Sequence, residues 1–188
     1  MRSKAKSHPV IGISFLSCRD ASRPIIMPLL AATYNSPIGT LNLISFDDLL
    51  LAANISNLRA AKESLHNDYD NFEIKSVSKL PIITELLDDY FDGDINAING
   101  IKVLQPGGAF SQKAWKAMRK VRGTISYSQL ADRAGSPAAV RAAGSACAKN
   151  AIVLVVPCHR IVKTGGNLGN YAYGLKKKEW LLNHEGAL

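Results

Sequence analysis

One short run of this chain could do nucleophilic chemistry, because Cys158, His159 and Arg160 follow one another directly. A free thiol has a pKa of about 8.5, so it needs a base or a nearby positive charge to act as a nucleophile at neutral pH. Titratable side chains are unusual neighbours for an inert core cysteine. A lone cysteine is more often a small packing residue, and that alternative applies here too. We interpret Cys158 as a nucleophile because of its two neighbours.

The residues before Cys158 are expected to hold it rigidly. Residues 153–156 read Val-Leu-Val-Val, and a short apolar run rich in β-branched residues predicts a buried strand. Pro157 fixes its own φ angle and favours an extended conformation at Val156. The sequence therefore predicts a strand over 153–156 that ends at the thiol and fixes its direction of attack.

Length and composition narrow the class of protein. The chain has 188 residues, enough for one large domain or two small ones. No apolar run approaches the roughly 18 residues of a membrane span, so we expect no membrane association. The three cysteines form neither a CxxC pair nor an even disulfide framework, which favours a reducing compartment and predicts a cytoplasmic protein. The Cys and His positions also lack the spacing of zinc ligands, so no metal is expected.

The net charge of +8 is unevenly distributed along the chain. Residues 27–104 carry five Lys/Arg against eleven Asp/Glu, a net charge of −6, whereas residues 105–188 carry thirteen against three, a net charge of +10. The basic part contains Cys158. This asymmetry is typical of a protein in which one half binds a polyanion and the other half does not. A basic surface that is simply solvated is the simpler alternative.

The sequence predicts three parts. Residues 1–26 combine basic residues with a short apolar run and are expected to be a disordered extension. Residues 27–104 alternate like antiparallel strands and predict an α+β scaffold domain. Its expected elements are strands over 40–46 and 49–55, turns at 34–39 and 47–48, and a helix over 84–91. The loop 105–108 (QPGG) begins a second domain, residues 105–188.

The second domain is predicted to be mainly helical. Ser111 is expected to cap a helix that runs to about Val121. The spacing of Ala114, Trp115 and Met118 places these three side chains on its inward face.

A second and a third helix are predicted close together. Residues 126–129 (SYSQ) have the form of a capping box and open a short helix to Ala134. Residues 135–137 (GSP) predict a stop, a cap and a first-turn proline for a helix over 138–147. Two short helices across a Gly-containing turn are typical of a helix-turn-helix. The third helix carries Arg141 among very small side chains, which suits a surface that comes close to a partner.

Three segments of the chain strongly resemble the O6-alkylguanine-DNA alkyltransferase family. They are RAAGSACAKN at 141–150, PCHRIV at 157–162 and GNYAYGLKKKEWLLNHEG at 169–186, within a likeness that covers about residues 110–186. Weaker likenesses occur at 36–39 and 87–91. PCHR alone would be a weak signal, but the segments together at family spacing are specific.

The resemblance implies a DNA repair protein that acts once. Such a protein binds double-stranded DNA as a monomer and flips the damaged base out of the duplex. Its cysteine, here Cys158, takes the alkyl group from O6 of alkylguanine, or from O4 of alkylthymine, as a stable thioether, with no cofactor. The resemblance also implies an α+β fold, with a small ribonuclease-H-like N-terminal domain followed by a mainly helical winged-helix or helix-turn-helix catalytic domain.

The resemblance further implies roles for individual residues. His159 would act through a bound water as the base on Cys158, since adjacent side chains of an extended chain point to opposite sides. Glu185 would orient His159 and stabilise its charge, and Asn150 would brace the site by hydrogen bonding. The implied DNA contacts are Tyr127, which would rotate the target phosphate, Arg141, which would fill the gap left by the flipped base, and the backbone-contact positions Ser111, Ser128, Ser136 and Thr164. The implied pocket residues are Tyr171, Ile161, Ala172 and Pro157.

Other functions share some of these features. A damage-sensing binder of the same fold would lack the nucleophile that Cys158 provides. A cysteine hydrolase would use a dyad of Cys158 and His159, but their adjacency disfavours a direct dyad and leaves the helix-turn-helix unexplained. A transcription regulator would not need a Cys-His-Glu set. Glu185 could also simply pair with Lys178 or with a helix end.

Overall fold

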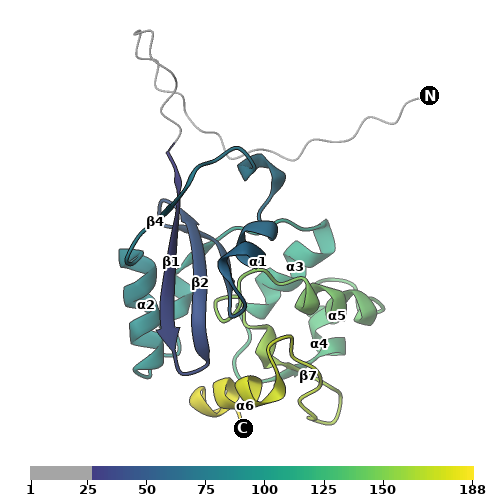
Figure 1. Cartoon of the computed structure of the whole chain (residues 1–188). Helices are drawn as coiled ribbons and strands as arrows, with labels where there is room; N and C mark the ends of the chain where they lie inside the picture. The colour runs from purple at the N-terminus through teal and green to yellow at the C-terminus, as the bar shows by residue number, and fades with distance from the viewer. Residues whose placement is uncertain (1–26) are drawn as a thin grey trace, which may run out of the picture.

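The computed structural model describes residues 27–188, so the extension predicted for residues 1–26 lies outside the described part of the chain. The fold is α+β, with a five-stranded mixed sheet beside a group of helices (Figure 1). The first elements are β1 (Leu29–Ser36), β2 (Gly39–Phe46), β3 (Leu49–Asn54), α1 (Leu58–Glu63), η1 (Asn67–Tyr69), β4 (Ile74–Ser76), α2 (Pro81–Phe91), η2 (Ala97–Gly100) and β5 (Lys102–Val103). They are followed by α3 (Ala109–Met118), β6 (Ile125–Ser126), α4 (Tyr127–Arg133), α5 (Val140–Ala148), η3 (Cys158–Arg160), β7 (Ile161–Val162) and α6 (Leu175–His184).

The large sheet has the strand order β4-β1-β2-β3-β5. Strands β1, β2 and β3 form an antiparallel meander, and β4 and β5 add parallel strands at the two edges. The strands predicted over 40–46 and 49–55 are confirmed to within one residue. The first turn is shorter than predicted, because β1 continues through Tyr34 to Ser36 and Gly39, at a φ of 112°, already begins β2. A φ of this kind costs glycine little, which is why the turn can be so tight.

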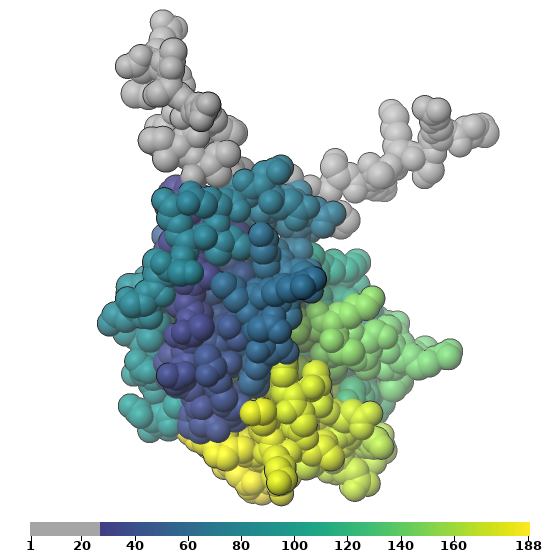
Figure 2. All heavy atoms as spheres, in the orientation of Figure 1, coloured from purple at the N-terminus to yellow at the C-terminus, as the bar shows by residue number. Residues whose placement is uncertain are grey.

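Each face of this sheet has its own apolar core. One face packs against α1 and the segment after it, through Leu29, Ala31, Ile44, Leu51, Ala52 and Ala61. The other face contributes to a larger cluster that extends from Ala32 in β1 to Leu181 in α6. Figure 2 shows the C-terminal helix (yellow) against the purple strands, where Lys177 Nζ donates to the carbonyl oxygen of Ile38. The sheet and the C-terminal helices therefore share one core.

The buried faces of the helices were predicted more accurately from the sequence than the residues at which the helices begin. Helix α2 begins at Pro81, three residues before the predicted start, because proline suits a first turn that needs no N–H donor. In α3, Ala114, Trp115 and Met118 are buried as predicted. No helix within residues 27–188 is long and apolar enough to cross a bilayer.

The predicted cap of α3 is wrong. Ser111 lies inside the helix, and Gly108 is the N-cap residue. The preceding loop explains the earlier start, because a Cβ on Gly107 would lie 2.4 Å from the ring of Trp115. The chain therefore passes closely over Trp115 and enters the helix directly after Gly108.

The two helices predicted after residues 126–129 and 135–137 are present, with one corrected boundary. The capping box of α4 is confirmed, because Gln129 N donates to Ser126 Oγ at 3.1 Å and Ser126 N donates to Gln129 Oε1 at 2.7 Å. Helix α5 begins at Val140, so the start predicted at Ser136 and Pro137 is wrong. Both residues instead belong to a turn closed by the bond from Ala139 N to the carbonyl oxygen of Ser136.

The strand predicted over 153–156 is wrong. These residues are buried, but they form a turn in which Leu154 has a φ of 73° and Val156 N donates to the carbonyl oxygen of Ile152 at 3.0 Å. A single parallel bridge between Ile152 and Ala53, in which Val153 N donates to the carbonyl oxygen of Ala53 at 2.9 Å, links this segment to the sheet. A fully apolar run carries no periodicity that separates a strand from a buried turn. Cys158 therefore begins a 3₁₀ turn, η3, and does not end a strand.

Candidate active site

Cys158 is a free and partly exposed thiol that is held by one amide side chain. Asn150 Nδ2 lies 3.3 Å from Cys158 Sγ and also donates to the carbonyl oxygen of Val156 at 2.7 Å. Asn150 is fixed in turn, because its Oδ1 accepts from Gln105 Nε2 at 3.1 Å and from Ile152 N at 3.1 Å. The thiol thus sits on a turn that an amide network holds, in a residue that is partly exposed.

His159 points inward, away from bulk solvent. Its side chain is fully buried, and its Nε2 lies 2.9 Å from Glu185 Oε1. Its other ring nitrogen, Nδ1, is buried and has no hydrogen-bond partner among the residues that the structure describes. A histidine whose Nε2 donates to a carboxylate carries its lone pair on Nδ1, where it can accept a proton. The imidazole is therefore oriented as a base.

Glu185 is the charged centre of the site. It is the C-cap residue of α6, and only 2% of its side chain is exposed. Its Oε2 accepts from Arg160 Nε at 2.7 Å, and its Oε1 accepts from Arg160 Nη2 at 3.0 Å and from the hydroxyl of Tyr90 at 2.8 Å. Arg160 also donates from Nη1 to the carbonyl oxygen of Val121 at 2.7 Å. Glu185 thus pairs with His159 and Arg160, and the structure gives it no contact with Lys178.

These contacts set the resting protonation of the site. Burial raises the pKa of the Cys158 thiol, although the hydrogen bond from Asn150 and the charge of Lys178 act in the opposite direction. Burial lowers the pKa of His159, and Glu185 opposes this effect. Burial also disfavours the Glu185 carboxylate, but the hydrogen bonds and charges of His159 and Arg160 outweigh it and lower its pKa to about 2. The resting site therefore holds a neutral thiol, a neutral imidazole and an ionised carboxylate.

Lys178 holds the loop on the other side of Cys158. It is fully buried on α6, and its Nζ donates to the carbonyl oxygens of Ile161, at 2.6 Å, and Leu168. A buried ammonium needs such partners, because desolvating an unpaired charge is costly. This lysine therefore ties the loop after β7 to α6 and adds positive charge near the thiol.

The two tyrosines predicted at the site lie within electrostatic reach of Cys158. Tyr171 is mostly buried, and burial, followed by the charge of Cys158, raises its pKa well above the ordinary range. Its hydroxyl has no hydrogen-bond partner within the described part of the chain, and its ring lies 5.7 Å from that of Tyr173, measured between centroids. Tyr127 is the first residue of α4, and burial together with the charges of Cys147 and Cys158 raises its pKa. The structure thus brings both rings to the thiol's side of the molecule.

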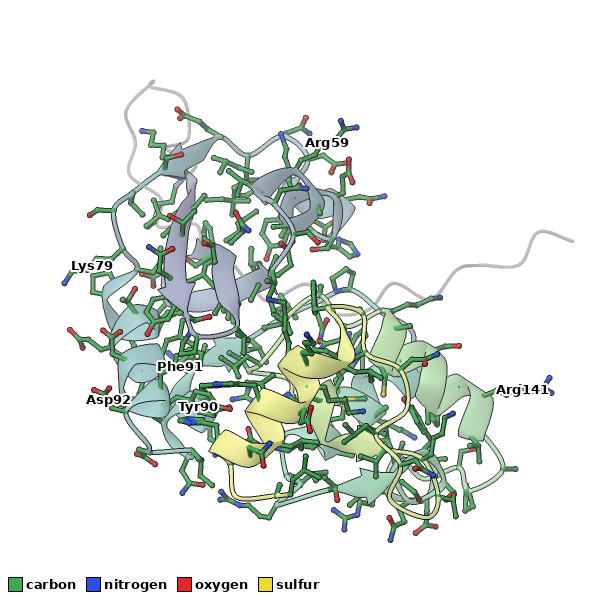
Figure 3. All side chains as sticks on the ribbon, turned by 60° about the horizontal axis from the view of Figure 1, so that its bottom comes forward. Arg59, Lys79, Tyr90, Phe91, Asp92 and Arg141 are labelled. Atoms are coloured by element: carbon green, nitrogen blue, oxygen red, sulfur yellow. The ribbon has the colours of Figure 1, made fainter. Side chains whose placement is uncertain are left out.

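The other predicted residues fall into a buried set and an exposed set. Pro157 and Ile161 are buried beside Cys158, whereas Ala172 is exposed. Arg141 is exposed near the start of α5 and projects away from the body of the protein (Figure 3). The four predicted backbone-contact positions are exposed or partly exposed: Ser111, Ser128, Ser136 and Thr164. Their contacts with DNA stay predictions.

The sequence analysis assigned no role in the site to four residues that build it: Tyr90, Gln105, Arg160 and Lys178. Arg160 follows His159 directly, so its position carried a signal. Lys178 lies three and four residues before Leu181 and Leu182, which are buried on the same helix, and this spacing places the lysine inward. Tyr90 and Gln105 gave no usable signal, because their partners lie 95 and 45 residues away in the chain.

Comparison with known proteins places this chain in one family. The model of the family described as "6-O-methylguanine DNA methyltransferase, DNA binding domain" matches residues 109–187. The chain is 37% identical over 127 residues to the methylated-DNA–protein-cysteine methyltransferase of Salmonella typhimurium, covering 66% of this chain and 74% of that protein. It is 32% identical over 169 residues to the protein of the same name from Shigella flexneri, covering 87% and 99%.

Solved structures agree with these relatives. The crystal structure of Mycobacterium tuberculosis O6-methylguanine methyltransferase matches with a TM-score of 0.65 and 28% identity, over 84% of this chain and 92% of that one. The structure of Mycobacterium tuberculosis OGT in complex with DNA matches with a TM-score of 0.67 and 28% identity, over 83% and 92%. The chain belongs to the methylated-DNA–protein-cysteine methyltransferase family, which confirms the resemblance found in the sequence.

Proposed function

We propose that this protein repairs alkylated DNA by transferring one alkyl group from O6 of guanine, or from O4 of thymine, to its own Cys158. The observation that carries this proposal is the arrangement of a partly exposed thiol beside a buried His159–Glu185 pair at 2.9 Å. Family membership supports the substrate, because the relatives are named for transfer from methylated DNA to a protein cysteine.

The chemistry is a displacement at saturated carbon. Because the resting thiol is neutral, its proton leaves as the reaction begins, and His159 Nδ1 takes this proton through one water molecule. The Cys158 sulfur then forms a bond to the alkyl carbon while the bond from that carbon to O6 breaks. The electron pair of the broken bond stays with the guanine, which takes up one proton, so that overall the proton of the thiol replaces the alkyl group on the base. Glu185 stabilises the imidazolium that forms. The thioether is stable, so each molecule acts once and needs no cofactor.

The helix-turn-helix supports DNA as the partner. Helix α5 presents small side chains and the exposed Arg141, and a second helix of this kind binds in the major groove of DNA in other proteins. The net charge of +10 on residues 105–188 favours the phosphate backbone. We assign Tyr127 to the target phosphate, Arg141 to the gap left by the flipped base and Tyr171 to the alkyl pocket. A buried O6 atom can be reached only when the base leaves the stack.

The finer fold description also belongs to this proposal. The meander β1–β2–β3 with β4 parallel to β1 supports a ribonuclease-H-like N-terminal part, although β5 pairs on the far side with β3. The β6–β7 pair beside α4 supports a winged helix-turn-helix. We also propose that the protein acts as a monomer, as the family resemblance implies. A reducing cytoplasm would keep the Cys158 thiol free.

Intact-mass measurement tests the function directly. Protein incubated with excess duplex DNA carrying O6-methylguanine should gain the mass of one methyl group in place of a hydrogen, once per molecule. Undamaged duplex of the same sequence should give no gain, and Cys158→Ala should give none on either DNA. Repeated turnover, or an unchanged mass in the wild-type protein, would reject the proposal.

A second measurement tests the role of Arg141. Arg141→Ala should slow transfer from duplex DNA much more than transfer from free O6-methylguanine base, because only the duplex leaves a gap to fill. Arg59→Ala is the matched control, since Arg59 is an exposed arginine of α1 that lies far from Arg141 (Figure 3). Equal losses on both substrates would remove the proposed role.

A further inference from the structure

A tyrosine from the N-terminal part of the chain reaches the charged centre of the site. Tyr90 lies on α2, is fully buried, and donates from its hydroxyl to Glu185 Oε1 at 2.8 Å. The same oxygen faces His159 Nε2 at 2.9 Å. Figure 3 shows Tyr90 on the side of α2 that is turned toward α6. One carboxylate oxygen therefore connects the N-terminal helix to the proposed base.

We propose that Tyr90 is a positioning residue for the transfer reaction, and this inference rests on the proposed function. Its hydroxyl fixes the rotation of the Glu185 carboxylate and takes up part of the negative charge on Oε1. The basicity of His159 is therefore set partly from α2, outside residues 109–187 that match the family's DNA-binding domain. A hydrogen bond to a charged acceptor is the kind of contact that shifts a neighbouring titration.

The direction of this hydrogen bond is fixed across neutral pH. Burial, followed by the charge of Glu185, raises the pKa of Tyr90 far above its ordinary value, so the phenol keeps its proton. The pKa of Glu185 is about 2, so the carboxylate stays ionised and can only accept. Tyr90 is therefore a permanent donor to Glu185 in the working range of the protein.

The ring of Tyr90 is held independently of its hydroxyl. Its centroid lies 5.1 Å from that of His184, and His184 Nε2 lies 2.8 Å from the backbone carbonyl oxygen of Tyr90. The ring also packs edge-on against Phe91 at 5.1 Å. Because these contacts do not use the hydroxyl, Tyr90→Phe keeps the packing between α2 and α6. That variant isolates the hydrogen bond.

Several charged or titratable groups surround Glu185, and the effect of the Tyr90 hydroxyl on His159 must be distinguished from theirs. Arg160 binds both oxygens of Glu185, and Lys178 lies close enough to lower the pKa of His159. The remaining groups around Glu185 are His159, His184, Tyr171 and Tyr90 itself. Among them only Tyr90 is a neutral donor to the oxygen that faces His159. Its loss leaves more negative charge on that oxygen, which strengthens the attraction for a proton on His159.

The test compares Tyr90→Phe with Tyr34→Phe. Tyr34 is the matched control, because its hydroxyl donates at 2.7 Å to Oδ1 of Asp88, a carboxylate on the helix that carries Tyr90. This hydrogen bond is exposed and does not involve Glu185. The first readout is the titration of the His159 imidazole by NMR in the free protein. Tyr90→Phe should raise the pKa of His159 by about half a unit or more, whereas Tyr34→Phe should leave it unchanged.

The second readout is the rate of methyl transfer against pH. The acidic limb of the rate profile reports protonation of His159, so in Tyr90→Phe this limb should move to higher pH by the same amount as the pKa. The plateau rate should fall several-fold, because the hydroxyl no longer fixes the rotation of the Glu185 carboxylate. Tyr90→Phe that unfolds more easily but titrates like the wild type would show a purely structural role and overturn the inference. The titration needs no substrate, so it tests Tyr90 even if no methyl transfer were found.

Discussion

The sheet of residues 27–104 and the site of residues 105–188 satisfy their buried backbone groups by different means. In the sheet, the strands pair in regular ladders, with seven Cα partners between β1 and β2 alone. Around Cys158 the chain makes a turn and a 3₁₀ turn, and side chains satisfy its carbonyl groups. Asn150 donates to the carbonyl oxygen of Val156 and Lys178 donates to that of Ile161, and Arg160 donates to the carbonyl oxygen of Val121 in the segment between α3 and β6.

The site residues therefore stabilise the fold and serve the chemistry at once. A ladder hydrogen bond uses no side chain, so a sheet tolerates many surface exchanges. A turn held by side chains depends on each of them. The two regions also place their ion pairs differently, because Arg160–Glu185 is almost fully buried and Lys102–Asp48 is exposed. Substitutions should therefore have unequal effects in the two regions.

The largest contrast is expected between these two ion pairs. Arg160→Met should lower the free energy of unfolding by about 3–5 kcal/mol, because it leaves Glu185 buried without its strongest partner. Lys102→Met should leave the stability nearly unchanged, because exposed pairs contribute little. Urea denaturation of both variants gives the comparison. Similar losses in the two variants would contradict it.

The pH dependence of stability should also be concentrated in the site. The folded pKa of Glu185, about 2, lies below its ordinary value of 4.5, so the unfolded state takes up the proton first as the pH falls. The carboxylate's contribution is present above about pH 4.5 and is lost as the pH falls toward 2, an effect of about 3 kcal/mol. Glu185→Gln is the control, and its stability difference from the wild type should narrow over this range. A constant difference would argue against the low pKa.

A smaller contrast is expected between two asparagines. Asn150→Ala removes a donor to Val156 and to Cys158, and should lower the free energy of unfolding by about 1–3 kcal/mol and slow methyl transfer. Asn57→Ala removes the cap of α1, where Asn57 Oδ1 accepts from Ala60 N at 2.8 Å. Asn57→Ala should lower the free energy of unfolding by about 1 kcal/mol and leave the rate of methyl transfer unchanged. Urea denaturation and single-turnover rates measure both. An unchanged rate in Asn150→Ala would separate Asn150 from the chemistry.

Local features of the fold could be predicted from the sequence, and long-range ones could not. The capping box of Ser126 and Gln129 depends on residues three apart, so its pattern is visible in the chain. The run 153–156 is buried as predicted, but it is apolar throughout, so nothing in it distinguishes a strand from a turn. The starts of α3 and α5 were wrong because loop packing, at Gly107 for example, decides where a helix begins.

The residues of the site were likewise predictable from the sequence only where they lie close together in the chain. The neighbours of Cys158, His159 and Arg160, identified a candidate nucleophile directly, whereas the role of His159 as the base came from resemblance to a family. Glu185 was connected to them only through resemblance to a family, and the structure places it 2.9 Å from the imidazole. The contact between Tyr90 and Glu185 joins two regions 95 residues apart, and only the shared core brings them together.

Locating the transferred methyl group tests directly whether Cys158 is the acceptor. Protein treated with one equivalent of duplex DNA containing O6-methylguanine should be digested and its cysteine peptides analysed by mass spectrometry. The methyl group should be found on Cys158 alone, and the peptide of the other described thiol, Cys147, should be unmodified. A methyl group on Cys147 or Cys18, with Cys158 unmodified, would contradict it.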